Sequence, residues 1–256
     1  MIAIKSRTIN EYVYQQFLDH VIGALGALSA QYQPVIDLGT AQVEYYEALL
    51  RISAPSDGPL YPDAFLTLMD QFGVMQEITL WIIERALTDL AVATDTRIFV
   101  NLAPSCLGSE ELLDQTSAGL TAHDVAPERL GFEIPWAALR ERTQIRDWLA
   151  RLADIGCRLA IDGCGAEDLA SVRFAGLSFD YVKFTAARGP ALAAEAARPE
   201  IIAAVADLAR TGTKAVAVGI EDEAALAAVR AAGFRWGQGY HLGLPSAELR
   251  RRPHMQ

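Results

Sequence analysis

The chain has 256 residues, of which 52% are hydrophobic and 21% are charged, and this composition excludes a disordered or fibrous protein. Its formal net charge of −10 argues against a broad basic surface for a nucleic acid polymer or for an anionic membrane. A phosphorylated ligand would have to be neutralised locally, by a few side chains or by metal ions. The three cysteines lack CxxC spacing and indicate neither a disulfide framework nor a zinc site, which fits the cytoplasm.

The N-terminal segment has the periodicity of an amphipathic helix. Apolar residues recur at helical spacing from Tyr12 to Leu25. The most apolar part, Val21 to Ala30, is too short to span a bilayer. We therefore predict a helix within residues 1–30 that packs on the rest of the protein, and neither a signal peptide nor a membrane anchor.

From residue 31 onward, short apolar runs alternate with helical patterns, which is typical of parallel strands joined by crossover helices. The expected strands are Gln33 to Leu38, Val43 to Ile52, Arg97 to Asn101, Leu130 to Ile134, Arg158 to Ile161, Tyr181 to Phe184, Ala215 to Val218 and Trp236 to Tyr240. The expected helices are Glu77 to Val92, Gln144 to Ile155, Glu200 to Arg210 and Glu223 to Ala232, and Ala186 to Ala197 is expected to be a helix or the segment leading into one.

Only a few residues separate the first two expected strands, so we predict that they form an antiparallel hairpin and not a βα unit. The fold class is therefore α/β, a TIM-like (β/α)8 barrel with an irregular, antiparallel first strand. The barrel is expected to occupy residues 31–250, and residues 251–256 to form a tail.

Polar residues stand where the expected strands end. The four at or near such an end are Asn101, Glu133, Asp162 and Lys183. In a closed parallel barrel the C-terminal strand ends converge on one rim, where Glu47 and Gln238 can join them. Three carboxylates and an amide oxygen around one centre repel one another unless a hard divalent cation lies among them. Such oxygen ligands suit magnesium, manganese or calcium.

Several short motifs also follow one another in a recognisable order. They are Tyr32 to Asp37, Glu47 to Arg51, Asn101 to Pro104, Glu133-Ile134, the segment Asp162 to Lys183, Glu221, Gln238 to Tyr240, and Pro245. This ordered set resembles the EAL domains, the cyclic di-GMP phosphodiesterases, whose name-giving motif is similar to Glu47-Ala48-Leu49. Because the matches run from about Tyr32 to Pro245 at the ends of expected strands, the chain is identified as a member of that family.

The resemblance implies a barrel whose rim binds two divalent cations and a cyclic dinucleotide, and hydrolysis of one phosphodiester by a metal-activated water to give linear pGpG. It implies that the first cation is held by Glu47, Asn101, Glu133 and Asp162. The ligand contacts that it implies are Gln33, Glu47, Leu49, Arg51, Asp162 and Pro245. Lys183, Glu221 and Gln238 would be the remaining catalytic residues.

The chain departs from the family where the second cation would bind. Gly163 and Val218 stand at two positions that carry acidic ligands in the family, and neither side chain offers a ligand atom. We therefore expect one Mg2+, Mn2+ or Ca2+ at most, no second metal site, and hydrolysis that is lower by several orders of magnitude. Trp136 also replaces a glutamate, and the loop Gly163 to Ser171 is altered, although Glu167 or Asp168 in that loop could act as a substitute ligand.

Three functions remain open at this point. The first is a degenerate receptor that binds cyclic di-GMP and signals to an unidentified protein partner. The second is a regulator that interacts with proteins without any ligand. The third is a slow, metal-dependent phosphodiesterase. The resemblance also leaves a homodimer open.

Overall fold

The computed structural model describes residues 28–54, 58–60, 69–70, 73–141, 145–165, 168, 178–185 and 191–249. The strands are β1 Leu28–Asp37, β2 Gln42–Ala54, β3 Gly58–Leu60, β4 Ile98–Asn101, β5 Leu130–Pro135, β6 Arg158–Cys164, β7 Tyr181–Thr185, β8 Lys214–Val218 and β9 Trp236–Gln238. The α-helices are α3 Met75–Val92, α4 Glu110–Ala122, α5 Trp136–Glu141, α6 Arg146–Asp154, α7 Ala191–Ala196, α8 Pro199–Thr211 and α9 Glu223–Ala231. The predicted N-terminal helix up to residue 27 and the tail lie outside the described residues.

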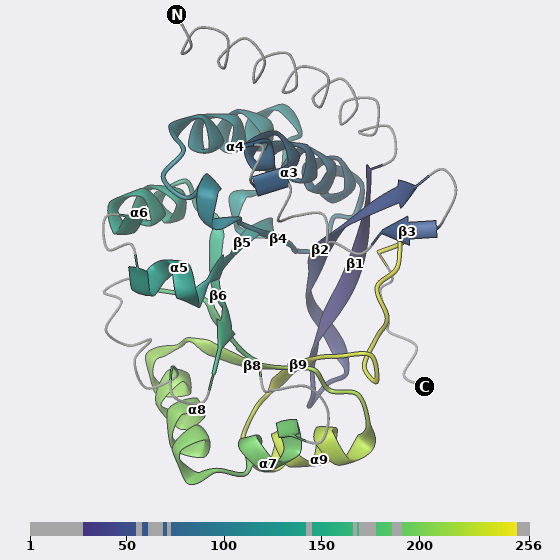
Figure 1. Ribbon diagram of the computed structural model, residues 1–256, viewed down its shortest axis with the longest axis vertical. Helices are drawn as coiled ribbons and strands as arrows, with labels where there is room; N and C mark the ends of the chain where they lie inside the picture. Colours follow the sequence, from purple (N-terminus) through teal and green to yellow (C-terminus); the bar gives the residue numbers. More distant parts are fainter. Residues whose placement is uncertain are drawn as a thin grey trace, which may run out of the picture.

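Eight strands close into a barrel (Figure 1). Strand β1 pairs antiparallel with both β2 and β9, and the remaining neighbours, from β2 through β4 to β9, pair in parallel. The ninth strand, β3, extends the edge of β2 outside the ring. The predicted barrel and its antiparallel first strand are therefore confirmed. Strand β1 begins at Leu28, three residues before the predicted start of the barrel.

The helices surround the barrel (Figure 1). Helix α3 packs against β2 and β4, α5 against β5 and β6, and α8 against β8. The sequence patterns predicted α3, α6, α8 and α9, and α7 lies within the Ala-rich segment expected to be a helix or to lead into one. They did not predict α4, α5 or β3, whose short or weakly apolar segments lack a strong period. Among the described residues no helix is long and apolar enough to cross a membrane.

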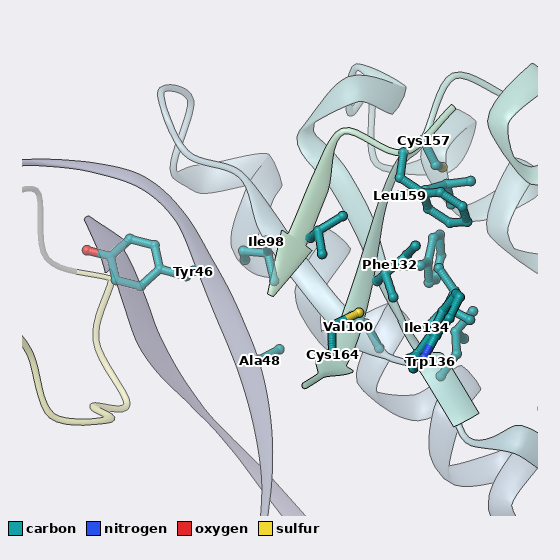
Figure 2. Close-up of a cluster of buried hydrophobic side chains, with 14 of the residues drawn as sticks. Tyr46, Ala48, Ile98, Val100, Phe132, Ile134, Trp136, Cys157, Leu159 and Cys164 are labelled. Carbon is teal, nitrogen blue, oxygen red and sulfur yellow. The ribbon is translucent and has the colours of Figure 1, made fainter. Parts of the chain in front are cut away.

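Strand pleating divides the side chains between the two faces of the barrel wall, because successive residues point to opposite sides. On β4 and β5 the outward set includes Ile98, Val100, Phe132 and Ile134, all fully buried against the helices. Figure 2 shows this outer core, with Trp136 and Cys164 at one end of it. Both residues are buried in the same cluster, so the tryptophan in place of the glutamate fills core space.

The inward set forms a layer that closes the barrel interior, which we call the lower layer. Its members, one from each strand of the ring, are Val35, Tyr45, Phe99, Gly131, Ala160, Tyr181, Val216 and Trp236. The rings of Tyr45, Phe99 and Tyr181 pack on one another with centroids 4.1 to 5.3 Å apart. This aromatic packing fills the barrel below its C-terminal rim, so that the interior is a core and not a channel.

An ion pair lies at the opposite, N-terminal end of the barrel. Glu44 accepts hydrogen bonds from the Tyr181 hydroxyl at 2.6 Å and from Lys214 Nζ at 2.5 Å. Burial alone would raise the pKa of Glu44, but the Lys214 ammonium and the tyrosine outweigh it, and the pKa lies below its usual value. The lysine also lies over the ring of Trp236, 5.1 Å from its centroid.

The lower layer requires a glycine at position 131. A Cβ built on Gly131 would stand 2.4 Å from the ring of Phe99, which has no room to move in a packed core. We expect Gly131→Ala to lower the free energy of unfolding by about 1–3 kcal/mol in urea denaturation. In a Phe99→Leu background the same substitution should cost less, because the smaller side chain leaves space. Equal losses in the two backgrounds would show that the ring contact is not the cause.

Candidate functional site

A second inward layer, the upper layer, lies two residues further toward the C-terminal rim on each parallel strand. Its members are Gln33, Glu47, Asn101, Glu133, Asp162, Lys183, Val218 and Gln238. Each of the eight barrel strands provides one residue, and seven of the eight are polar. The strand pleat and barrel closure therefore assemble the polar cluster, as the positions of the strand ends predicted.

Lys183 stands at the centre of the upper layer. Its Nζ donates to Glu47 Oε2 at 2.6 Å and to Glu133 Oε2 at 2.5 Å, and it lies 3.9 Å from Asp162 Oδ1. The lysine side chain is 2% exposed and that of Glu133 is completely buried, whereas Asp162 is 35% exposed at the mouth. One ammonium group therefore joins carboxylates from three different strands.

Glu47 is the acceptor that the other members share. Asn101 Nδ2 donates to its Oε1 at 2.7 Å, and Gln238 Nε2 donates to its Oε2 at 2.7 Å, beside the lysine. The same Gln238 nitrogen lies 3.4 Å from Gln33 Oε1. The buried Oε1 of Gln238 has no hydrogen-bond partner within the described part of the chain. Three donors thus hold the Glu47 carboxylate, and one acceptor oxygen beside it is unsatisfied.

The two carboxylates bound to Lys183 have different electrostatic environments. Burial disfavours the charge on Glu47, but the ammonium and the two amide donors outweigh burial and hold its pKa below the usual value. Burial and the neighbouring Glu47 charge hold the pKa of Glu133 well above its usual range. Burial would lower the pKa of Lys183, but the surrounding carboxylates raise it well above its usual value, so the lysine is an ammonium ion.

The oxygen ligands implied for a divalent cation, from Glu47, Asn101, Glu133 and Asp162, meet here around the Lys183 ammonium, and their chemistry suits such an ion. The Lys183 ammonium lies 2.5 and 2.6 Å from two carboxylate oxygens, which is close to the distance at which calcium binds oxygen. Asn101 directs its NH2 group, not its oxygen, to Glu47. Among the described residues no three Asp, Glu, His or Cys side chains are arranged to hold a metal ion.

Gly163 and Val218 stand at the two positions where the resemblance implies ligands for a second cation. Gly163 has a φ of +74°, in the left-handed region, and a Cβ built there would meet no atom within 4 Å. Val218 packs against the lower layer and supplies the one apolar side chain of the upper layer. Asp168 lies 3.6 Å from Arg140 and accepts a hydrogen bond from the Gly165 backbone, so it faces its own loop. Glu167 lies outside the described residues.

Glu221 is not part of the cluster. It follows the end of β8 with an exposed side chain, and within the described residues no hydrogen bond or ion pair joins it to the upper layer. Of the three residues implied to be catalytic, the structure thus brings together Lys183 and Gln238 only.

The implied ligand-contacting residues lie around the mouth of the barrel. Gln33 donates to the Gly243 carbonyl at 3.2 Å, and the backbone of Tyr32 pairs with Ser246, so the segment carrying Pro245 lies beside β1. Arg51 donates from Nε to Gln31 Oε1 at 2.9 Å and is partly exposed. These residues flank the mouth on the side of β1 and β2.

A cavity of about 500 Å3 opens beside the cluster, between α3 and the rim of β2 and β4. Leu49 and Asn101 line it, with Ile78 and Ile82 from α3 and the carboxylate-bearing Asp70. The sequence patterns assigned Ile78 and Ile82 only to a helix, and their part in a cavity depends on how α3 packs on the barrel. Tyr45, which donates to Glu133 Oε1 at 3.4 Å, was also missed, although it stands two residues before Glu47 on the same face.

The two partners of Lys183 should respond differently to the same substitution. Burial and the neighbouring Glu47 disfavour the charge on Glu133, and Glu47 still pairs with Lys183 when Glu133 is changed, so for Glu133→Gln we expect the free energy of unfolding to stay within about 1 kcal/mol of wild type or to rise. Glu47→Gln removes the charge that holds three donors, and we expect a loss of about 2–4 kcal/mol. Urea denaturation of both variants at the same pH measures the difference. Equal losses would contradict the unequal roles of the two carboxylates.

Comparison with known proteins places the chain in a family. The sequence pattern described as the EAL domain matches residues 17–245. The chain is 31% identical over 227 residues to the cyclic di-GMP phosphodiesterase NbdA of Pseudomonas aeruginosa, covering 85% of this chain and 29% of NbdA. It is 28% identical over 207 residues to the cyclic di-GMP phosphodiesterase PdeF of Escherichia coli, covering 78% of this chain and 28% of PdeF. It therefore spans less than a third of the length of these relatives.

Two solved structures with the same fold support this family assignment. The PaMucR phosphodiesterase in complex with c-di-GMP has a TM-score of 0.77 at 26% identity, and the match covers 90% of this chain and 97% of that one. The FimX EAL domain of Xanthomonas citri in complex with c-diGMP has a TM-score of 0.79 at 19% identity, covering 95% and 99%, which shows the shared fold. Together with the match over residues 17–245, these likenesses mean that the chain belongs to the EAL domain family.

Proposed function

We propose that this EAL domain is catalytically impaired and acts as a receptor for cyclic di-GMP. The observation that carries the proposal is the composition of the upper layer. The polar residues implied to contact ligand and first cation are present and meet at one rim, while Gly163 and Val218 offer no ligand atom where a second cation would bind. In a two-metal reaction the pair of ions stabilises both the attacking and the leaving oxygen, so losing one ion's ligands lowers the rate far more than the affinity.

The relatives support cyclic di-GMP as the ligand. NbdA and PdeF are named as cyclic di-GMP phosphodiesterases, and the PaMucR and FimX structures were determined with the dinucleotide bound. The mouth of this barrel has features that suit such a molecule.

The cavity beside the cluster suits a nucleobase. Its lining is largely apolar, with Leu49, Ile78 and Ile82 offering surfaces against which a flat base can pack. Asn101 and Asp70 add polar groups at its border that can bond to the edge of a base. Arg51, two residues beyond Leu49 on β2 and partly exposed, is the cationic residue among the implied ligand contacts and can neutralise phosphate charge.

Slow hydrolysis is the alternative for this same site. It would require one Mg2+, Mn2+ or Ca2+ at Glu47, Asn101, Glu133 and Asp162, with Lys183 beside the reacting phosphate. Such an activity would depend on manganese or magnesium, produce pGpG, and be lost in Glu47→Ala. The other alternative is a regulator that does not need the dinucleotide. It would bind its protein partner equally well with or without this ligand. The proposed setting is the cytoplasm, with an unidentified protein partner and either a monomer or a homodimer.

Isothermal titration of cyclic di-GMP into the purified protein tests the receptor proposal, followed by chromatography of the recovered nucleotide. We expect a dissociation constant in the micromolar range or below and intact dinucleotide. Arg51→Ala should weaken binding by about tenfold or more, since a charged contact to phosphate is lost. Arg210→Ala, which removes an exposed arginine from α8 far from the mouth, is the matched control and should bind like wild type.

Each other outcome identifies an alternative. Absence of binding would contradict the receptor proposal and favour the ligand-independent regulator. Recovery of pGpG that disappears in Glu47→Ala would establish the phosphodiesterase. Equal weakening by Arg51→Ala and Arg210→Ala would show that the arginine effect is one of overall charge and not of the mouth.

A further inference from the structure

The hairpin of β1 and β2 continues beyond the rim of the barrel. Strand β2 pairs with β4 only as far as Ala48, whereas its pairing with β1 extends to Ile52. Successive residues of a strand alternate between its two faces, so every second residue shares the face of the upper layer. Three cross-strand pairs lie on that face: Gln33 opposite Glu47, Gln31 opposite Leu49, and Ser29 opposite Arg51. This face of the hairpin therefore extends the mouth beyond the upper layer.

A hydrogen bond joins Gln31 and Arg51 across this face. Arg51 Nε donates to Gln31 Oε1 at 2.9 Å, and Arg51 Nη1 donates to the Leu50 carbonyl at 2.9 Å. The register makes Gln31 and Arg51 diagonal neighbours on adjacent strands, a separation that long side chains can span. A guanidinium group has donors only, so the amide oxygen of Gln31 must face it. The two bonds, one to β1 and one to β2, fix the plane of the guanidinium group.

These bonds leave the end of the guanidinium group available to a ligand. Within the described residues they use Nε and one N–H group of Nη1, which leaves the other N–H groups of both terminal nitrogens. Two terminal N–H groups are what an arginine uses for a paired contact with a phosphate. Because Arg51 is already held in one orientation, it loses less conformational entropy when it binds an anion than a mobile arginine does.

The neutrality of Gln31 also matters. A carboxylate at this position would hold Arg51 as well, but its negative charge would offset the charge of the guanidinium group and repel an anionic ligand. The amide oxygen orients Arg51 and leaves its full positive charge for the mouth. Both side chains are partly buried, so water competes less for this hydrogen bond than for one on an exposed surface.

We propose that Gln31 is a positioning residue for ligand binding, which orients Arg51 so that its terminal nitrogens receive a phosphate group at the mouth. The inference deepens the proposed function and rests on it, because Arg51 is the cationic residue among the implied contacts to cyclic di-GMP. The sequence patterns did not assign Gln31 to the site, since only the pairing of β1 with β2 brings this glutamine to Arg51.

A double-mutant cycle, measured by calorimetric titration of cyclic di-GMP, tests the proposal. Q31M keeps the length of the side chain but removes the acceptor oxygen, and we expect the dissociation constant to rise about three- to tenfold. In an Arg51→Ala background the same substitution should change the dissociation constant by less than about twofold, because no guanidinium group remains to be oriented. An equal effect of Q31M in both backgrounds would overturn the proposal, since Gln31 would then act on the ligand or on the fold directly.

The matched control is Gln115→Met. Gln115 is an exposed glutamine on α4, a helix that packs on α3 outside the barrel. Its replacement should leave the dissociation constant as in wild type. A rise equal to that in Q31M would contradict a specific role of Gln31.

A second measurement needs no ligand. The Nε–H group of a hydrogen-bonded arginine exchanges slowly with water, so Arg51 should give a nitrogen–proton NMR cross-peak, identified by its absence in Arg51→Ala. We expect this cross-peak to persist in Q31E, which keeps an acceptor oxygen, and to be lost in Q31M. Equal intensity in wild type and Q31M would overturn the proposal. If the cross-peaks behave as expected but wild type does not bind cyclic di-GMP, the receptor function fails and the hold of Gln31 on Arg51 stands, so the two failures are distinguished.

Discussion

The ammonium group of Lys183 is the point on which the mouth of this barrel depends. It is buried, and it bonds to carboxylates that reach the rim from β2 and β5, with that of β6 close by. Without a positive charge among them these carboxylates would repel one another in a region from which water is largely excluded. The ion pairs of the upper layer therefore stabilise the mouth of the barrel, and any ligand would bind among side chains that these ion pairs hold in place.

The two inward layers of the barrel have different roles: the lower layer stabilises the fold, and the upper layer carries the polar groups of the mouth. The lower layer, which includes Tyr45, Phe99 and Tyr181, packs the barrel interior, and this packing does not depend on which reaction or ligand the mouth serves. The upper layer lies one pleat nearer the solvent, where polar side chains can be satisfied by one another and by a ligand. Gly163 and Val218 stand where the family resemblance implies acidic ligands, and the lower layer is complete with these two residues present, so the proposed lack of second-cation ligands is compatible with a complete barrel.

Much of this could be predicted from the sequence, and the limits have physical causes. Strand order, the antiparallel start and the meeting of Asn101, Glu133 and Asp162 followed from the apolar periods and from barrel closure. The place of Lys183 between Glu47 and Glu133 did not, because the reach and direction of a long side chain depend on what the opposite strands offer. The cavity beside α3 likewise depends on helix packing, and the left-handed backbone at Gly163 depends on the irregular register between β6 and β7. Helices α4 and α5 were missed because their apolar periodicity is weak.

The alternation of the two layers has a further consequence for how such a domain can change. A substitution in the upper layer alters the chemistry of the mouth and leaves the pleat as it was, as Val218 illustrates. Inserting or deleting one residue within a strand would instead turn that strand's inward side chains outward and place aliphatic residues of the outer core at the mouth. The pleat of the barrel thus depends on the number of residues between the rim positions, whereas the identity of the rim residues sets the chemistry and the ion pairs of the mouth.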